Sequence, residues 1–236
     1  MTELRKKMIR AMELKNLSHN TQRAYLAAVT GIAKFYKQSP DKMTQEKIED
    51  YLLYLKLDKG IAPNSCYGVL SGLRFFYKHV TEEEIPVTYS IRRTARKLPE
   101  VLTMDDIWKI ICSAKNLKHK MILMTTYSAG LRASETLNLK TENIDSQTML
   151  IKVEDGKGKK DRYTLLSKRL LAELRAYYCK YRPGIYLFPS SYNKKKKRPL
   201  SYESIRTIYE NARKKAGVKK GNGIHTLRHS FATHLL

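Results

Sequence analysis

Apolar residues recur at offsets of three and four through the first third of the chain, the spacing of one face of an α-helix. Helical segments begin after Ser18, Thr44 and Pro63, residue types that are favoured at helix starts. A shorter amphipathic segment with Leu4 and Met8 precedes them. Residues 1–85 are therefore predicted to form a small helical domain. The inward-facing residues expected in the three later segments are Tyr25, Ala28, Val29, Ile32, Phe35, Tyr36, Ile48, Tyr51, Leu52, Leu55, Leu70, Leu73, Phe76 and Tyr77.

The helical pattern fails over residues 86–99, a segment that has a proline at each end. Arg92, Arg93, Arg96 and Lys97 crowd into this segment. We interpret it as a basic interdomain linker that lies along a polyanionic partner. A solvated hinge that touches no partner is the alternative, because runs of charge are usually solvated.

Residues 100–236 predict a second domain that is mainly helical and contains one β-hairpin. Apolar residues alternate at 149, 151 and 153, a glycine-rich turn follows, and Tyr163 and Leu165 continue the alternation on the return. Helices are expected on both sides of this hairpin. The predicted fold class is α+β: mainly α with a small β-hairpin or sheet, in two domains that form a C-shaped clamp.

Charge indicates what such a clamp would hold. The 236 residues carry 46 lysines and arginines against 22 aspartates and glutamates, a formal net charge of +24. With 42% apolar residues the chain is too hydrophobic to be a disordered basic tail, so a folded protein that binds double-stranded DNA is the first interpretation. No apolar run predicts a membrane span or a signal peptide, which favours a cytoplasmic, nucleoid-associated protein. The 3 cysteines lie far apart in the sequence and are interpreted as reduced.

Three segments of the second domain carry polar residues that a helical core would not require. The first places Arg132 after a glycine break, with Glu135 three residues on. The second, residues 156–162, places lysines at the predicted hairpin tip, and the third places His225 and Arg228 one helical turn apart. Each segment has a structural alternative: a surface ion pair, solvated turn lysines, and a helix-capping histidine beside an exposed arginine.

Two arginines, a histidine and a lysine together suit displacement at a phosphodiester without a metal ion. Planar guanidinium groups make bidentate contacts to nonbridging oxygens and stabilise the charge that develops there. A histidine can hydrogen-bond the same oxygens, and a lysine whose pKa is lowered by nearby cations can protonate the leaving oxygen. Asp105 and Asp106 are explained as a helix cap rather than as metal ligands, so we expect no metal and no cofactor.

The order of these motifs resembles the tyrosine recombinase, or phage integrase, family, with its Xer and integron-integrase branches the most similar. The matching strings are G-L-R-A-S-E from residue 130, G-K-G-K-K-D-R from residue 156 and H-T-L-R-H-S-F-A-T-H-L-L from residue 225. The resemblance is strong over residues 98–236. It is weaker but consistent over the first third, where the family has a small helical, SAM-like core-binding domain.

This resemblance implies a site-specific recombinase or integrase that cuts and rejoins DNA through a 3′-phosphotyrosyl intermediate. It implies catalytic roles for Arg132, Lys157, His225 and Arg228, with Lys157 as general acid, and a supporting role for Glu135. Lys159 and Lys160 are alternatives to Lys157, because a change of hairpin register would exchange their positions. The family further implies a dimer on each recombination site and a tetramer in synapsis for the full-length parent.

One feature of the family is missing from the sequence. Its members place a tyrosine nucleophile after the last matching helix, whereas this chain ends at Leu236 with no tyrosine beyond Tyr209. Packing in helices or strands is expected to explain Tyr127, Tyr163, Tyr177, Tyr178 and Tyr209. We therefore expect residues 100–236 to be a C-terminally incomplete catalytic domain that binds DNA without cleaving it. A non-catalytic, sequence-specific DNA-binding regulator and a type IB topoisomerase-like enzyme are the alternative functions.

Contacts to DNA are expected from both domains and from the linker. Polar side chains that lie off the predicted apolar stripes, at a helix start or in basic runs are the candidates. They are Asn64, Arg74, Lys78, Arg92, Arg93, Lys159, Ser201, Tyr202 and Arg206.

Overall fold

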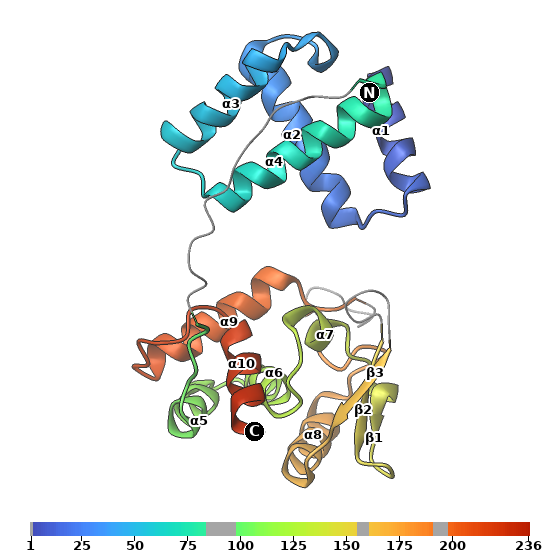
Figure 1. Ribbon diagram of the computed structural model, residues 1–236. Helices are drawn as coiled ribbons and strands as arrows, with labels where there is room; N and C mark the ends of the chain where they lie inside the picture. The colour runs from blue at the N-terminus through green and yellow to red at the C-terminus, as the bar shows by residue number, and fades with distance from the viewer. Residues whose placement is uncertain (1, 84–97, 155–160, 191–197) are drawn as a thin grey trace. The chain divides into compact units, whose positions relative to one another are not determined.

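The computed structural model describes residues 2–83, 98–154, 161–190 and 198–236. The chain divides into two compact units, residues 1–95 and 96–236, and each is described by itself (Figure 1). The predicted fold class, mainly α-helical with a small sheet, is confirmed. The domain boundary expected near residue 85 and most of the expected linker lie outside the described residues. Within the described residues, no helix is both long and apolar enough to cross a membrane.

The first unit is helical throughout its regular structure. Its helices are α1 (Glu3–Leu14), α2 (His19–Tyr36), α3 (Gln45–Leu57) and α4 (Pro63–Phe76), with a 3₁₀ turn η1 (Pro40–Lys42) and a π turn η2 (Tyr77–Thr81). The predicted helix starts are confirmed for α2 and α3, because the Ser18 and Thr44 hydroxyls accept the backbone N–H groups of Thr21 and Lys47. Local capping chemistry therefore sets the start of both helices.

The core of this unit matches most of the predicted apolar stripes. Ile32, Ile48, Leu70 and Leu73 are fully buried, as expected. The prediction for Phe35 is wrong, since 42% of this residue is exposed. Its ring lies against the rings of Tyr51 and Tyr54 at the end of α2 rather than inside the core, with centroids 5.3 and 4.5 Å away. The helical stripe therefore stops about one turn before the helix does.

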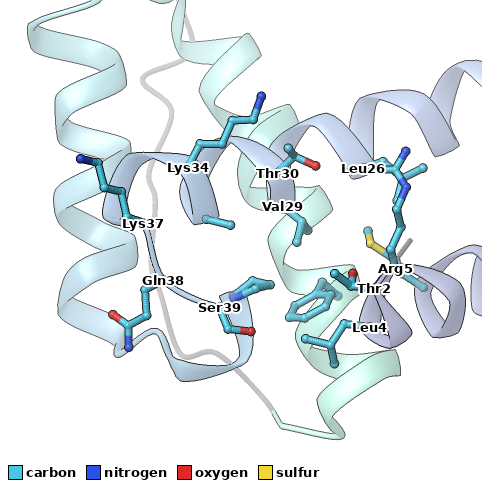
Figure 2. A pocket seen from close by; sticks show the side chains of 14 residues that line it. Thr2, Leu4, Arg5, Leu26, Val29, Thr30, Lys34, Lys37, Gln38 and Ser39 are labelled. Carbon is cyan, nitrogen blue, oxygen red and sulfur yellow. The ribbon is translucent and has the colours of Figure 1, made fainter.

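A cavity of about 790 Å³ opens in the first unit beside α1, α2 and η1 (Figure 2). Met8, Val29 and Phe76 contribute apolar surface to its lining. Figure 2 shows the charged ends of Lys34 and Lys37 extending away from this apolar part. None of the candidate catalytic or DNA-contacting residues predicted from the sequence lines the cavity, so the predicted chemistry lies elsewhere.

The second unit is built around one buried helix, α6. Its helices are α5 (Met104–Ser113), α6 (Leu117–Ser128), α7 (Ala133–Asn138), α8 (Lys168–Tyr181), α9 (Tyr202–Lys215) and α10 (His225–His234), with a 3₁₀ turn η3 (Thr141–Asn143). Residues 121–127 of α6 are all buried, and α5, α7, α8, α9 and α10 all contact this helix (Figure 1). The turn that leaves α6 is thus held in place from several sides.

A three-stranded antiparallel sheet of order β1-β2-β3 completes the unit. The strands are β1 (Ile144–Asp145), β2 (Leu150–Val153) and β3 (Arg162–Leu165). β2 and β3 form the predicted hairpin, in which Val153 pairs with Arg162 and Ile151 with Thr164. The sequence did not predict β1, because a strand of 2 residues has no alternation to detect.

The inward face of β3 is polar, and this contradicts one interpretation of the sequence. Tyr163 is 64% exposed and Leu165 53% exposed, so packing does not explain Tyr163. Thr164 instead faces the turn that follows α6, where its hydroxyl donates a 2.8 Å hydrogen bond to the carbonyl of Ala129. The strand meets polar backbone groups at this turn, and those groups require donors rather than apolar side chains.

Candidate active site

The turn between α6 and α7 carries the first predicted arginine. Gly130 has φ +58°, a left-handed conformation that glycine adopts without strain. A Cβ at this position would lie 2.3 Å from the ring of Phe231 on α10, so a side chain would collide as well. Both the backbone conformation and the close approach of Phe231 therefore require glycine at position 130. The turn brings Arg132 to the position just before α7, where its backbone is still extended.

Glu135 organises this turn through both of its carboxylate oxygens. Oε2 accepts the backbone N–H of Arg132 at 2.8 Å, which caps α7. Oε1 accepts Nη1 of the same arginine at 2.7 Å. The ion pair considered as an alternative is therefore present. It is not a surface pair, because only 5% of the Glu135 side chain is exposed. A buried carboxylate therefore orients the Arg132 guanidinium.

Arg228 reaches the same carboxylate from the other end of the sequence. Its Nη1 donates to the carbonyl of Gly130 at 2.5 Å and lies 3.5 Å from Oε2 of Glu135. The structure thus brings together Arg132, Glu135 and Arg228, which the sequence separates by more than ninety positions. The side chains of Arg132 and Arg228 are 34% and 31% exposed, so both guanidinium groups remain open to a ligand.

Arg162 is a third guanidinium at this site, and sequence reasoning assigned it no role. Its Nη2 lies 2.6 Å from Oε2 of Glu135. The residue stands at the end of the lysine-rich motif, yet β3 turns it toward the carboxylate while its neighbour Tyr163 faces outward. No pattern in the sequence marked this arginine, because the alternation of Tyr163 and Leu165 indicated the opposite face of the strand as the inner one. We call Arg132, Glu135, Arg162 and Arg228 the Glu135 cluster.

The electrostatics of the cluster favour an anionic ligand. Burial alone would raise the pKa of Glu135, but hydrogen bonds from Arg132 and the charges of Arg162 and Arg132 outweigh it and lower that pKa. The carboxylate is therefore ionised at neutral pH. Since guanidinium groups stay protonated, the cluster carries two more positive charges than negative ones. Partly exposed guanidinium groups with surplus charge are suited to binding the oxygens of a phosphate.

His225 begins α10, three residues before Arg228. Its pKa is lowered by burial and then by the nearby charges of His229, Arg228 and Arg132, so its imidazole is neutral at pH 7. The hydroxyl of Tyr202 at the start of α9 lies 3.4 Å from its Nε2. A neutral imidazole beside two guanidinium groups can donate or accept a hydrogen bond at a phosphate oxygen.

The other predicted contacts are placed only in part. Lys157, Lys159, Arg92 and Arg93 lie outside the described residues. Ser201 caps α9, because its hydroxyl accepts the backbone N–H of Ser204 at 3.1 Å. The remaining candidates, which are exposed side chains on α4, η2 and α9, are Asn64, Arg74, Lys78, Tyr202 and Arg206. Among the described residues, no three His, Cys, Asp or Glu side chains form a group that could hold a metal ion.

Comparison with known protein families decides the ancestry of this arrangement. Residues 100–236 match the "Phage integrase family" and residues 4–87 match "Phage integrase, N-terminal SAM-like domain". The chain belongs to the phage integrase family. The two matches cover nearly the whole sequence and leave residues 88–99 between them. The resemblance inferred from the motifs is thereby confirmed.

Individual relatives within the phage integrase family agree. A "Putative integrase/recombinase y4qK" of Sinorhizobium fredii is 38% identical over 100% of this chain and 76% of that protein. "Tyrosine recombinase XerA" of Pyrococcus horikoshii is 32% identical over 95% of this chain and 76% of that protein. Among solved structures, "Crystal structure of XerA recombinase" matches with TM-score 0.53 at 26% identity, covering 99% of this chain and 83% of that one.

A more distant structure shows the same fold. "Crystal structure of a lambda integrase tetramer bound to a Holliday junction" matches with TM-score 0.72 at 18% identity, covering 99% of this chain and 73% of that one. At this identity the likeness is one of fold. The helical unit and the mixed unit of this chain are thus both elements of integrase architecture.

Proposed function

We propose that this protein acts in site-specific DNA recombination and that the Glu135 cluster is where it holds the phosphate to be cut. The observation that carries the proposal is the convergence of Arg132 and Arg228 on one buried carboxylate, with neutral His225 beside them. This is an oxyanion site built without a metal-ligand cluster among the described residues. Membership of the phage integrase family supports the same activity.

Four of the residues predicted from the sequence have a definite task in the proposed cleavage. The guanidinium groups of Arg132 and Arg228 bind the nonbridging oxygens of the phosphate and stabilise the charge that grows there in the transition state. His225 hydrogen-bonds the same oxygens. Lys157, at the position that the resemblance gives to the general acid, protonates the 5′ oxygen as it leaves. The product of this half-reaction in the family is a 3′-phosphotyrosyl link, which a 5′ hydroxyl later resolves.

The proposal for the 236-residue chain itself is that it binds DNA and does not cut it. Tyr177 and Tyr209 are buried donors to the carbonyls of Leu187 and Gly221, and burial raises the pKa of Tyr209 to about 12. Neither can act as a nucleophile without leaving the core. Tyr202 differs, since it is exposed and its hydroxyl contacts His225. Its hydroxyl lies beside the imidazole that is proposed to bind the phosphate, which makes it the tyrosine to test.

The experiment is covalent capture on a nicked duplex, from which the short cleaved fragment diffuses away and traps any adduct. The expected result is retarded, non-covalent DNA binding and no protein–DNA adduct after denaturation. An adduct formed by the chain but lost in Tyr202→Phe would identify Tyr202 as a nucleophile and overturn the proposal. An adduct that survives this substitution would assign another tyrosine and overturn it equally.

Assembly and DNA contact belong to the same proposal. The exposed side chains Asn64, Arg74, Lys78 and Arg206, together with the linker arginines, supply phosphate contacts from both units. The lambda integrase neighbour is a tetramer on a Holliday junction, which supports a dimer on each site and a tetramer in synapsis for this protein as well. Acting on the chromosome would place it in the cytoplasm, with the nucleoid.

A further inference from the structure

Arg162 makes the shortest ion pair of the Glu135 cluster, and the proposed cleavage gives it no task. Its Nη2 lies 2.6 Å from Oε2 of Glu135, compared with 2.7 Å for Arg132 on Oε1 and 3.5 Å for Arg228 on Oε2. The partner carboxylate is buried, with 5% of its side chain exposed. Removing one partner of a buried charge costs more than removing one partner of an exposed pair.

The two oxygens of Glu135 are bound from different directions. Oε1 is taken by the Arg132 guanidinium, whereas Oε2 is shared by the Arg132 backbone N–H and by Arg162. A carboxylate held at both oxygens cannot rotate about its last side-chain bond without breaking one contact. Arg162 adds the side-chain contact at Oε2, and so helps to fix the plane of the carboxylate that orients the Arg132 guanidinium.

Arg162 is itself held by the sheet. It is the first residue of β3 and pairs with Val153 of β2, whose side chain is 3% exposed. Its ion pair consequently ties the sheet to the first turn of α7. Such a link gives the guanidinium that orients Glu135 a rigid support, as a supporting residue of an active site requires.

Arg162 also favours the charged form of Glu135. Its charge is among the influences that lower the pKa of this carboxyl, against the effect of burial. Without it, Oε2 would keep the Arg132 backbone N–H and the longer contact from Arg228. Oε2 would then be less strongly held, so the carboxylate would break its contacts with Arg132 and turn toward Arg228 more easily.

We propose that Arg162 is a positioning residue of the phosphate site, acting on DNA through Glu135 and Arg132 rather than by touching the phosphate. This inference rests on the proposed function, because it assumes that Arg132 binds a DNA phosphate. Exposure does not distinguish Arg162 from Arg132 and Arg228, because all three side chains are 31–34% exposed, so the distinction is left to the double-mutant cycle. The inference predicts that Arg162 matters only while Glu135 carries a charge.

The test is a double-mutant cycle on DNA affinity, measured by fluorescence anisotropy with a fluorescein-labelled duplex of mixed sequence. The variants are Arg162→Ala, Arg162→Lys, Glu135→Gln and the two double variants that combine Glu135→Gln with each Arg162 substitution, with Arg132→Ala as the reference for the site. Arg175→Ala is the matched control, because Arg175 is an exposed arginine of the same unit with no ion pair to any described residue. Fluorescence of Trp108 gives the folded fraction, and affinity is expressed per folded molecule.

Arg162→Ala is expected to weaken binding about tenfold, or 1.4 kcal/mol, and Arg162→Lys to recover part of the loss by restoring one donor. In the Glu135→Gln background, Arg162→Ala and Arg162→Lys should have no further effect. If the losses of Arg162→Ala and Glu135→Gln multiply, Arg162 acts on DNA directly and the inference is wrong. If Arg132→Ala weakens binding while Arg162→Ala behaves like the control, the inference fails alone. If Arg132→Ala also behaves like the control, the proposed function fails and takes the inference with it.

Discussion

Glu135→Ala is the substitution that tests the architecture of the site most severely. It removes a buried carboxylate and leaves three guanidinium groups facing one another. Deleting one partner of a buried ion pair costs about 3–5 kcal/mol. Because the guanidinium side chains each keep 31–34% exposure, water can take over part of their hydrogen bonding. The expected loss of unfolding free energy is therefore at the lower end, about 3 kcal/mol at pH 7.

Urea unfolding followed by Trp108 fluorescence measures this loss in the second unit. The sequence has 1 tryptophan, and it lies in α5 with the guanidinium of Arg169 over its ring, 4.1 Å from the centroid. With a slope of about 2 kcal/mol per molar urea, the midpoint should fall by about 1.5 M. Glu203→Gln is the control, because its ion pair with Arg206 is exposed and spans 3.9 Å. That variant should unfold within about 0.5 kcal/mol of the wild type.

The pH dependence of the same measurement separates charge from packing. The folded-state pKa of Glu135 lies below its ordinary value of 4.5, so the stabilisation by its charge is complete above pH 4.5 and is lost as the pH falls through the folded-state pKa. Glu135→Gln resembles the protonated side chain at every pH. The stability difference between wild type and Glu135→Gln should therefore be constant near pH 7 and shrink below about pH 4.5. A stability difference that is absent at pH 7, or unchanged in acid, would show that the charge of Glu135 does not stabilise the second unit.

Three further outcomes follow from the same geometry. Gly130→Ala should destabilise the second unit by about 1–3 kcal/mol more than Gly217→Ala, because both glycines have positive φ but only Gly130 faces Phe231. Equal urea midpoints for the two variants would contradict this expectation. NMR titration should place the pKa of His225 below 6.5, and Arg228→Ala should raise it, since that charge helps to lower it; a midpoint above 6.5 would contradict the neutral imidazole. The logarithm of DNA affinity should fall with the logarithm of salt by about 0.9 per phosphate contact, and a flat response would rule out electrostatic binding.

Local signals in the sequence predicted most of the fold. The starts of α2, α3 and α5 were visible because a hydroxyl caps a backbone N–H three residues on, as Thr103 does for Asp106. The spacing of apolar residues along each helix likewise located Ile48 and Leu70 in the core. These interactions join residues close in sequence, so a pattern within one segment contains them.

Only the site residues that belong to recognisable sequence motifs were predicted. Arg132, Glu135 and Arg228 were found from the spacing of their motifs and lie together in the structure. Arg162 was missed, and Tyr163 was placed on the wrong face, because the inner face of β3 meets the turn after α6 rather than an apolar layer. Which face of a short strand is covered depends on tertiary packing, and alternation alone does not reveal it.

The proposed function depends above all on Arg132 binding a phosphate of DNA. The most direct measurement is the affinity of Arg132→Ala for a labelled duplex at fixed salt, compared with Arg175→Ala. Both variants remove one positive charge from the same unit, but only Arg132 belongs to the Glu135 cluster. We expect Arg132→Ala to lose about tenfold in affinity, as when a charge-assisted hydrogen bond is removed, and Arg175→Ala to lose much less. Equal losses for the two variants would contradict the proposed function.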